Sequence, residues 1–145
     1  MTSYIETQHL AVDTLEQLNQ AAGQFSEQLN PGNVVALQGD LGAGKTTFSQ
    51  MLLKHCGVTD VVKSPTYTLY EQYQVGEQGY VHMDLYRLTD PEELFFMGIE
   101  DLLDGRQILL VEWPDKGKGV LPEADWTLVF QLSGLNRTLT ITSNS

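Results

Sequence analysis

The sequence predicts an α/β protein, a three-layer sandwich in which helices cover both faces of a mixed, mostly parallel sheet. Two continuous apolar runs, 34–37 and 108–111, have the composition of strands that are buried on both faces of a parallel sheet. Helical patterns of apolar residues precede and separate these runs. A third pattern, two strands at 66–75 and 79–86 joined by a Gly-containing loop, predicts an antiparallel hairpin within the same sheet.

Length and charge restrict the class of protein. The 145 residues fit one domain over 1–145, and the formal net charge is −11. This charge argues against direct DNA or RNA binding, which needs clusters of Lys and Arg against phosphates. No apolar run approaches the roughly 20 residues that span a membrane, and the N-terminus has no signal-peptide pattern. The single cysteine excludes an intrachain disulfide, so we expect a cytoplasmic protein.

Residues 39–47 fit G-x-x-x-x-G-K-[ST], the pattern of a phosphate-binding P-loop. An apolar strand pattern precedes the motif and a helix pattern follows it, which is the context that such a loop requires. Lys45 is predicted to reach the β- and γ-phosphates of a nucleotide, and the Thr46 hydroxyl to bind Mg²⁺. The predicted nucleotide-binding residues of the motif are Gly39, Asp40, Leu41, Gly42, Ala43, Gly44, Lys45, Thr46 and Thr47.

The other elements follow in chain order. A helix over 15–29 is predicted before the P-loop, and Asp13 with Glu16 resembles a capping box at its start. Another helix is predicted from Asp90-Pro91, with a break at Gly98. Residues 125–132 and 137–142 have the composition of two further strands.

Two polar segments after the P-loop helix are candidates for catalysis. Thr66 stands where many P-loop proteins have a threonine that responds to the γ-phosphate, although an ordinary Ser/Thr turn fits the spacing equally well. Alternation along the next strand places His82, Asp84 and Tyr86 on one face. We interpret this face as functional; the alternative is a solvated strand face with a surface ion pair to Arg87. Alternation from Asp84 places the Arg87 side chain on the opposite face of the strand.

The apolar run 108–111 ends at Glu112, where a Walker B strand carries its metal-binding acid. That acid is usually Asp. The longer Glu leaves open whether the carboxylate contacts Mg²⁺ directly or through a water. The Asn-Lys-x-Asp motif that reads guanine is absent, which favours ATP over GTP.

Four segments, taken in order, resemble the TsaE (YjeE) family of bacterial tRNA threonylcarbamoyladenosine modification. They are the P-loop 39–47, Ser64-Pro-Thr-Tyr-Thr-Leu69, His82-Met-Asp-Leu-Tyr-Arg87 and Val111-Glu-Trp-Pro114. The resemblance implies a P-loop ATPase that converts Mg-ATP to ADP and resets the TsaB–TsaD complex, so that tRNA is reached only through that complex.

The resemblance also implies roles for single residues. Thr46 and Glu112 would bind Mg²⁺, and the acid at position 84 would be important for activity. Thr7 and Arg137 would lie near the nucleotide. We therefore expect Lys45, Asp84 and Thr66 to act in catalysis.

Two other functions stay open at this point. A small-molecule P-loop kinase would usually close a lid with several arginines over the phosphates, and this chain has only Arg87, Arg106 and Arg137. A nucleotide-gated binding module would need no meaningful turnover. Because no arginine finger is evident either, we expect slow intrinsic hydrolysis that a partner complex stimulates.

Overall fold

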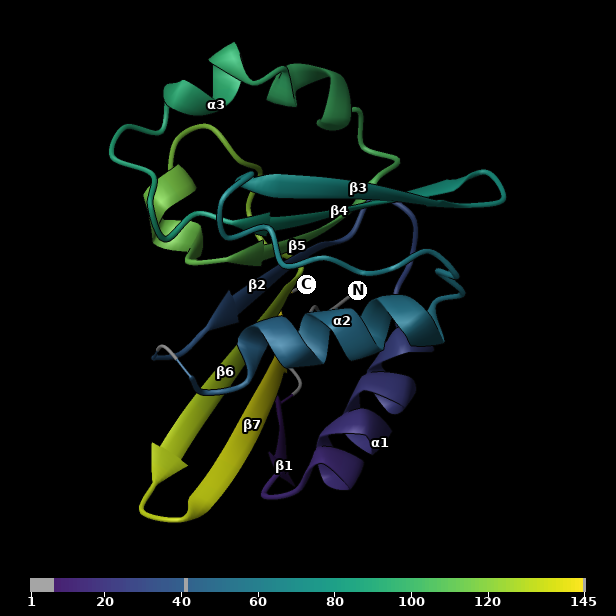
Figure 1. Ribbon diagram of the computed structural model, residues 1–145, viewed down its shortest axis with the longest axis vertical. Helices are drawn as coiled ribbons and strands as arrows, with labels where there is room; N and C mark the ends of the chain where they lie inside the picture. The colour runs from purple at the N-terminus through teal and green to yellow at the C-terminus, as the bar shows by residue number, and fades with distance from the viewer. Residues whose placement is uncertain (1–6, 41, 145) are drawn as a thin grey trace, which may run out of the picture.

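The computed structural model describes residues 7–40 and 42–144, and within them seven strands form one sheet (Figure 1). The strand order is β1-β7-β6-β2-β5-β4-β3. The strands are β1 (Thr7–Ala11), β2 (Val34–Gln38), β3 (Tyr70–Val75), β4 (Gln78–Asp84), β5 (Ile108–Glu112), β6 (Trp126–Ser133) and β7 (Asn136–Ser143). The helices are α1 (Leu15–Ser26), α2 (Lys45–His55), α3 (Glu93–Phe96) and the 3₁₀ helices η1 (Ile99–Leu102) and η2 (Pro114–Gly117).

The centre of the sheet is parallel and its edges are antiparallel. Strand β2 pairs in parallel with β5 and β6, and β4 pairs in parallel with β5. Strand β3 joins β4, and the pair β7 and β1 joins β6, in antiparallel register. The predicted mixed α/β sheet is confirmed. Because the four central strands run the same way, their carboxyl ends meet at one edge, where open α/β sheets bind ligands.

Helices cover both faces of this sheet, as predicted. Helices α1 and α2 lie in front of the strands in Figure 1 and form one core with them, in which Phe25 and Phe48 are fully buried. On the other face, Leu94 of α3 and Ile99 of η1 pack against Met83 and neighbouring residues of β4 and β5. This second cover is short, because the predicted break at Gly98 is real: its φ is 79°, and η1 follows it.

The start of α1 differs from the prediction by one residue. The Thr14 hydroxyl accepts from the Gln17 N–H at 3.1 Å, and the Gln17 side chain accepts from the Thr14 N–H at 3.2 Å. These two bonds form the capping box that we placed at Asp13 and Glu16. The Asp13 carboxylate instead accepts from the Arg137 N–H at 2.6 Å, and so ties the start of the helix to the β6–β7 hairpin.

The hairpin strands are shorter than predicted at the end near the P-loop. Residues 65–69 form a turn in which the Leu69 N–H donates to the Pro65 carbonyl at 2.9 Å, and Leu69 has a φ of 68°. Strand β3 therefore begins at Tyr70 and β4 ends at Asp84. The Asp84 N–H donates to the Leu69 carbonyl at 2.9 Å, so the turn lies directly beside the end of β4.

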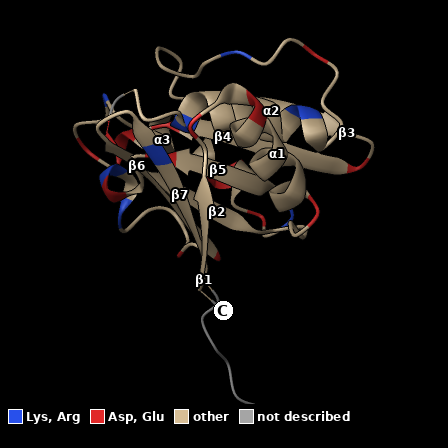
Figure 2. Ribbon diagram, turned by 90° about the horizontal axis from the view of Figure 1, so that it is seen from below, with Lys and Arg blue, Asp and Glu red and all other residues tan. Residues whose placement is uncertain are grey.

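The helices and the distribution of charged residues both bear on the sequence predictions. None of the helices in the described ranges has both the length and the apolar composition to cross a bilayer. In Figure 2, segments of Lys and Arg are interspersed with Asp and Glu, as expected of a chain with 8 basic and 19 acidic residues.

Candidate nucleotide-binding site

The P-loop connects the carboxyl end of β2 to the start of α2. Gly39 has a φ of 146°, and a Cβ atom there would lie 2.6 Å from the Phe130 carbonyl oxygen, so only glycine fits this close approach. Gly44 has a φ of 106° where the chain turns into α2. Helix α2 begins at Lys45, and its N-terminal N–H groups are therefore available to an anion. Leu41, also predicted to bind nucleotide, lies outside the described residues.

A cleft of about 330 Å³ opens beside this loop. Its walls come from the P-loop and the first turn of α2, from the ends of β4 and β5, and from the β6–β7 hairpin. It brings together predicted site residues from separate parts of the sequence, among them the neighbours Lys45 and Thr46 and the distant Thr66, Asp84 and Glu112.

Lys45 is held by two contacts at the mouth of the loop. Its Nζ donates to the Gly39 carbonyl at 2.5 Å and lies 3.8 Å from the centroid of the Trp113 ring. Burial lowers the pKa of the Lys45 ammonium, although the nearby carboxylates of Glu112, Asp84 and Asp40 act in the opposite direction. A bound phosphate would compensate the buried cation.

Trp113 is a cleft residue to which the sequence gave us no role. It follows Glu112 with a φ of 58°, which is a left-handed conformation that is unusual for a bulky residue. The ring centroids of Trp113 and Tyr86 are 5.1 Å apart. This turn brings the indole over Lys45. Only the motif Val111-Glu-Trp-Pro114 hinted at Trp113, because a positive φ at a non-glycine residue has no sequence signal.

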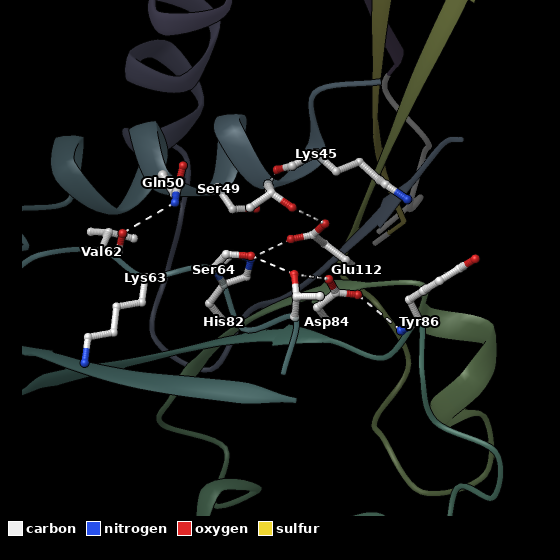
Figure 3. Close-up of polar contacts among 12 residues, drawn as sticks. Lys45, Ser49, Gln50, Val62, Lys63, Ser64, His82, Asp84, Tyr86 and Glu112 are labelled. Carbon is white, nitrogen blue, oxygen red and sulfur yellow. Dashed lines mark hydrogen bonds and ion pairs between the residues drawn. The ribbon is translucent and has the colours of Figure 1, made fainter. Parts of the chain in front are cut away.

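Glu112 is 2 % exposed, and both of its carboxylate oxygens are engaged. Oε1 accepts from the Thr46 hydroxyl at 2.8 Å, and Oε2 lies 2.6 Å from Nε2 of His82 (Figure 3). The two predicted metal-binding residues, Thr46 and Glu112, are therefore in direct contact. The His82 contact was not predicted.

Asp84 lies beside this pair at the end of β4. Its Oδ1 accepts from the Tyr86 N–H at 3.1 Å, and its Oδ2 lies 3.5 Å from the Thr66 hydroxyl. Burial raises the pKa of the Asp84 carboxyl, and the negative charge of Glu112 adds to that rise; the Tyr86 N–H opposes it. His82 and Asp84 are both buried, so the alternative of a solvated strand face does not apply to them. Tyr86, which we placed on the same face, lies beyond the end of β4 and is 44% exposed.

The donors in this cleft fit Mg²⁺ bound together with a nucleotide. A hydroxyl and two carboxylates are hard oxygen ligands, which this ion prefers. No group of three or more His, Cys, Asp or Glu side chains in the described part of the chain is arranged to hold a metal by itself. Mg²⁺ usually keeps several waters and binds through one or two carboxylates and the phosphates of its substrate.

The remaining predicted residues differ in their position. Arg137 and Thr47 line the cleft. Thr7 does not line it. The end of β1 nearest the cleft residue Arg137 is Ala11, which pairs with Thr138, whereas Thr7 lies at the opposite end of β1 and pairs with Thr142.

The prediction for Arg87 was wrong. Arg87 lines the same cleft as Asp84, with its guanidinium 4.6 Å from the centroid of the Tyr67 ring. We had placed it on the opposite strand face, but β4 ends at Asp84, so alternation no longer applies beyond that residue.

Comparison with known proteins gives consistent matches. The model of the family described as "Threonylcarbamoyl adenosine biosynthesis protein TsaE" matches residues 12–139. A protein of Haemophilus influenzae, tRNA threonylcarbamoyladenosine biosynthesis protein TsaE, is 55% identical over 92 residues, or 63% of this chain and 58% of that protein. The protein of the same name from Bacillus subtilis is 38% identical over 104 residues, or 72% of this chain and 65% of that protein. The matched part of the chain thus spans about three fifths of the length of these relatives.

A solved structure agrees with the fold. The crystal structure of Bacillus subtilis YdiB superposes with a TM-score of 0.79 at 27% sequence identity. The superposition covers 99% of this chain and 90% of that one.

Proposed function

The chain belongs to the family of threonylcarbamoyl adenosine biosynthesis proteins TsaE, and from this premise we propose that it is a cytoplasmic Mg-ATPase of tRNA threonylcarbamoyladenosine biosynthesis. It binds ATP, hydrolyses it to ADP, and thereby resets the TsaB–TsaD complex, through which alone it acts on tRNA. The observation that carries the proposal is the convergence of Lys45, Thr46, Asp84 and Glu112 on the cleft at the P-loop.

Each of these side chains has one task in the proposed reaction. The backbone N–H groups of the P-loop and the start of α2 bind the phosphates, and Lys45 contacts the β- and γ-phosphates. Thr46 and Glu112 hold Mg²⁺, which, when bound, neutralises charge that develops on the phosphates. This role is supported by the 2.8 Å contact between the Thr46 hydroxyl and Oε1 of Glu112.

Asp84 positions the attacking water and accepts its proton. Its raised pKa supports this role, because a carboxylate that is a stronger base accepts a proton more readily. Thr66 lies 3.5 Å from Oδ2 of Asp84 on the turn 65–69, and so connects the attacking side of the cleft to that turn. If the conformation of the turn 65–69 changes when nucleotide binds, the position of the Asp84 carboxylate would change with it through Thr66.

Hydrolysis depends on the partner complex because charge stabilisation at the γ-phosphate needs an arginine in addition to Lys45, and the Arg87 side chain is engaged with another residue. The Arg87 guanidinium lies on the ring of Tyr67, a side chain that is 82% exposed. A partner that contacts Tyr67 can release Arg87 towards the phosphates or supply its own arginine. Without such a group, a P-loop protein turns over at roughly 10⁻⁴ to 10⁻³ per second, and one with its arginine in cis at about 10⁻² per second.

Steady-state phosphate release, measured with and without purified TsaB–TsaD, tests this function. We expect slow release from the isolated chain and a clear rise with the complex, and we expect Lys45→Ala to abolish both. A lone chain that turns over at several per second, unchanged by TsaB–TsaD, would contradict the proposed partner dependence. Absence of ATP binding would contradict the proposed activity.

A further inference from the structure

We infer that His82 is a positioning residue of this site: it fixes the Glu112 carboxylate so that Oε1 faces the Thr46 hydroxyl. The inference rests on the proposed function, since it concerns how the same site holds Mg²⁺. His82 does not line the cleft and acts only through Glu112.

The contacts form a continuous line through three elements. His82 lies on β4, two residues before its end, and is 0% exposed. Its Nε2 lies 2.6 Å from Oε2 of Glu112 at the end of β5, and Oε1 of Glu112 accepts from Thr46 in the first turn of α2. Strands β4 and β5 pair in parallel with His82 opposite Leu110, so the imidazole can reach Glu112 diagonally from the neighbouring strand.

The surroundings of Nδ1, the second ring nitrogen of His82, indicate that the contact between Nε2 and Glu112 is the reason for a histidine at this position. Nδ1 of His82 is buried and has no hydrogen-bond partner among the residues that the structure describes. Buried polar atoms are usually satisfied, and an apolar side chain would fill the position without this penalty. The bond in which Nε2 donates to Oε2 of Glu112 is therefore what a histidine adds here over an apolar side chain.

Glu112 needs such a partner more than an aspartate would. Both acids have a broad torsion at the carboxylate, but the extra methylene of glutamate adds one more rotatable bond that must be fixed. When His82 holds Oε2, only one orientation remains for Oε1, and this orientation meets Thr46. His82 on β4 thus orients Glu112 at the end of β5, in the way that hydrogen-bond partners orient other metal ligands.

A matched pair of variants tests this inference. His82→Gln and His82→Met have side chains of similar length, but only the glutamine amide can donate to Glu112. The measurement is the Mg²⁺ concentration that half-saturates binding of fluorescent mant-ATP to the full chain. We expect His82→Gln to stay near the wild-type value and His82→Met to need about ten-fold more Mg²⁺.

Two controls separate positioning from folding. Binding of mant-ATP in EDTA reports an intact P-loop and should be alike in the wild type and both variants. In a Glu112→Gln background, His82→Met should cause no further change, because the carboxylate that it positions is gone. If His82→Met loses binding in EDTA, the comparison is made with His82→Asn, whose amide is too short to reach Glu112.

If the half-saturating Mg²⁺ concentration shifts equally in His82→Gln and His82→Met, or in neither, His82 does not position Glu112. The proposed metal site is unaffected by that result as long as mant-ATP binding to the wild type depends on Mg²⁺. If the wild type itself binds mant-ATP without any Mg²⁺ dependence, both this inference and the proposed metal site are wrong.

Discussion

Phe48 connects the P-loop helix to the sheet, so Phe48→Ala should destabilise the protein strongly. Its ring is fully buried on α2 and packs edge-on against Phe130 of β6 at 5.4 Å between centroids; the Phe25 ring of α1 lies at 6.4 Å. Truncation of a buried phenylalanine to alanine costs about 3–5 kcal/mol in the free energy of unfolding. Since a domain of this size loses about 2–4 °C per kcal/mol, the melting temperature should fall by roughly 6–20 °C.

The same substitution at Phe96 is the matched control. That side chain is 91% exposed on α3, so Phe96→Ala should change the free energy of unfolding by no more than about 0.5 kcal/mol. Urea unfolding followed by circular dichroism, with calorimetric melting of the same samples, measures both variants. Similar losses at the two positions would show that the packing of α2 against β6 is not what holds the P-loop helix in place.

Two further predictions concern the cleft. Lys45→Ala should remove most ATP binding with or without Mg²⁺, because it deletes the cation at the phosphates, whereas Thr46→Ala should mainly weaken the Mg²⁺-dependent part. Nucleotide titrations in Mg²⁺ and in EDTA separate the two variants, and identical behaviour would refute the assignment. Glu112→Gln should weaken Mg²⁺–nucleotide binding, whereas Asp84→Asn should spare binding and slow phosphate release; the reverse result would exchange their roles. Because burial raises the pKa of Asp84, its ionised form opposes folding above the ordinary aspartate pKa, so Asp84→Asn should also raise the melting temperature at neutral pH.

Local signals in the sequence were sufficient for the class of fold and for naming most of the residues that line the cleft. The P-loop needs only consecutive residues, since its glycines and its lysine act through the backbone that they belong to. The apolar strands β2 and β5 were recognised because a strand buried on both faces has little room for polar residues. His82 and Asp84 could be placed on one face because both lie within a regular strand, where alternation holds.

Alternation failed where the strand ended. The Leu69 carbonyl accepts the Asp84 N–H, and the chain then leaves the sheet, which brings Arg87 into the cleft instead of away from it. The capping box of α1 lies at Thr14 and Gln17, whose spacing is a local Thr-x-x-Gln signal that we passed over in favour of Asp13 and Glu16. The contact of the Asp13 carboxylate with the Arg137 N–H, like the turn beside Asp84, depends on a partner that is remote in the sequence.

The sequence by itself determined that a P-loop motif, a buried acidic strand end and a polar strand face exist in this protein. Only the tertiary structure decided that these three meet: β5 lies between β2 and β4, and this order puts Glu112 within reach of both Thr46 and His82. Strand order is set by the packing of the whole sheet and leaves no trace in any one segment. The same holds for the left-handed turn at Trp113, which places its ring over Lys45.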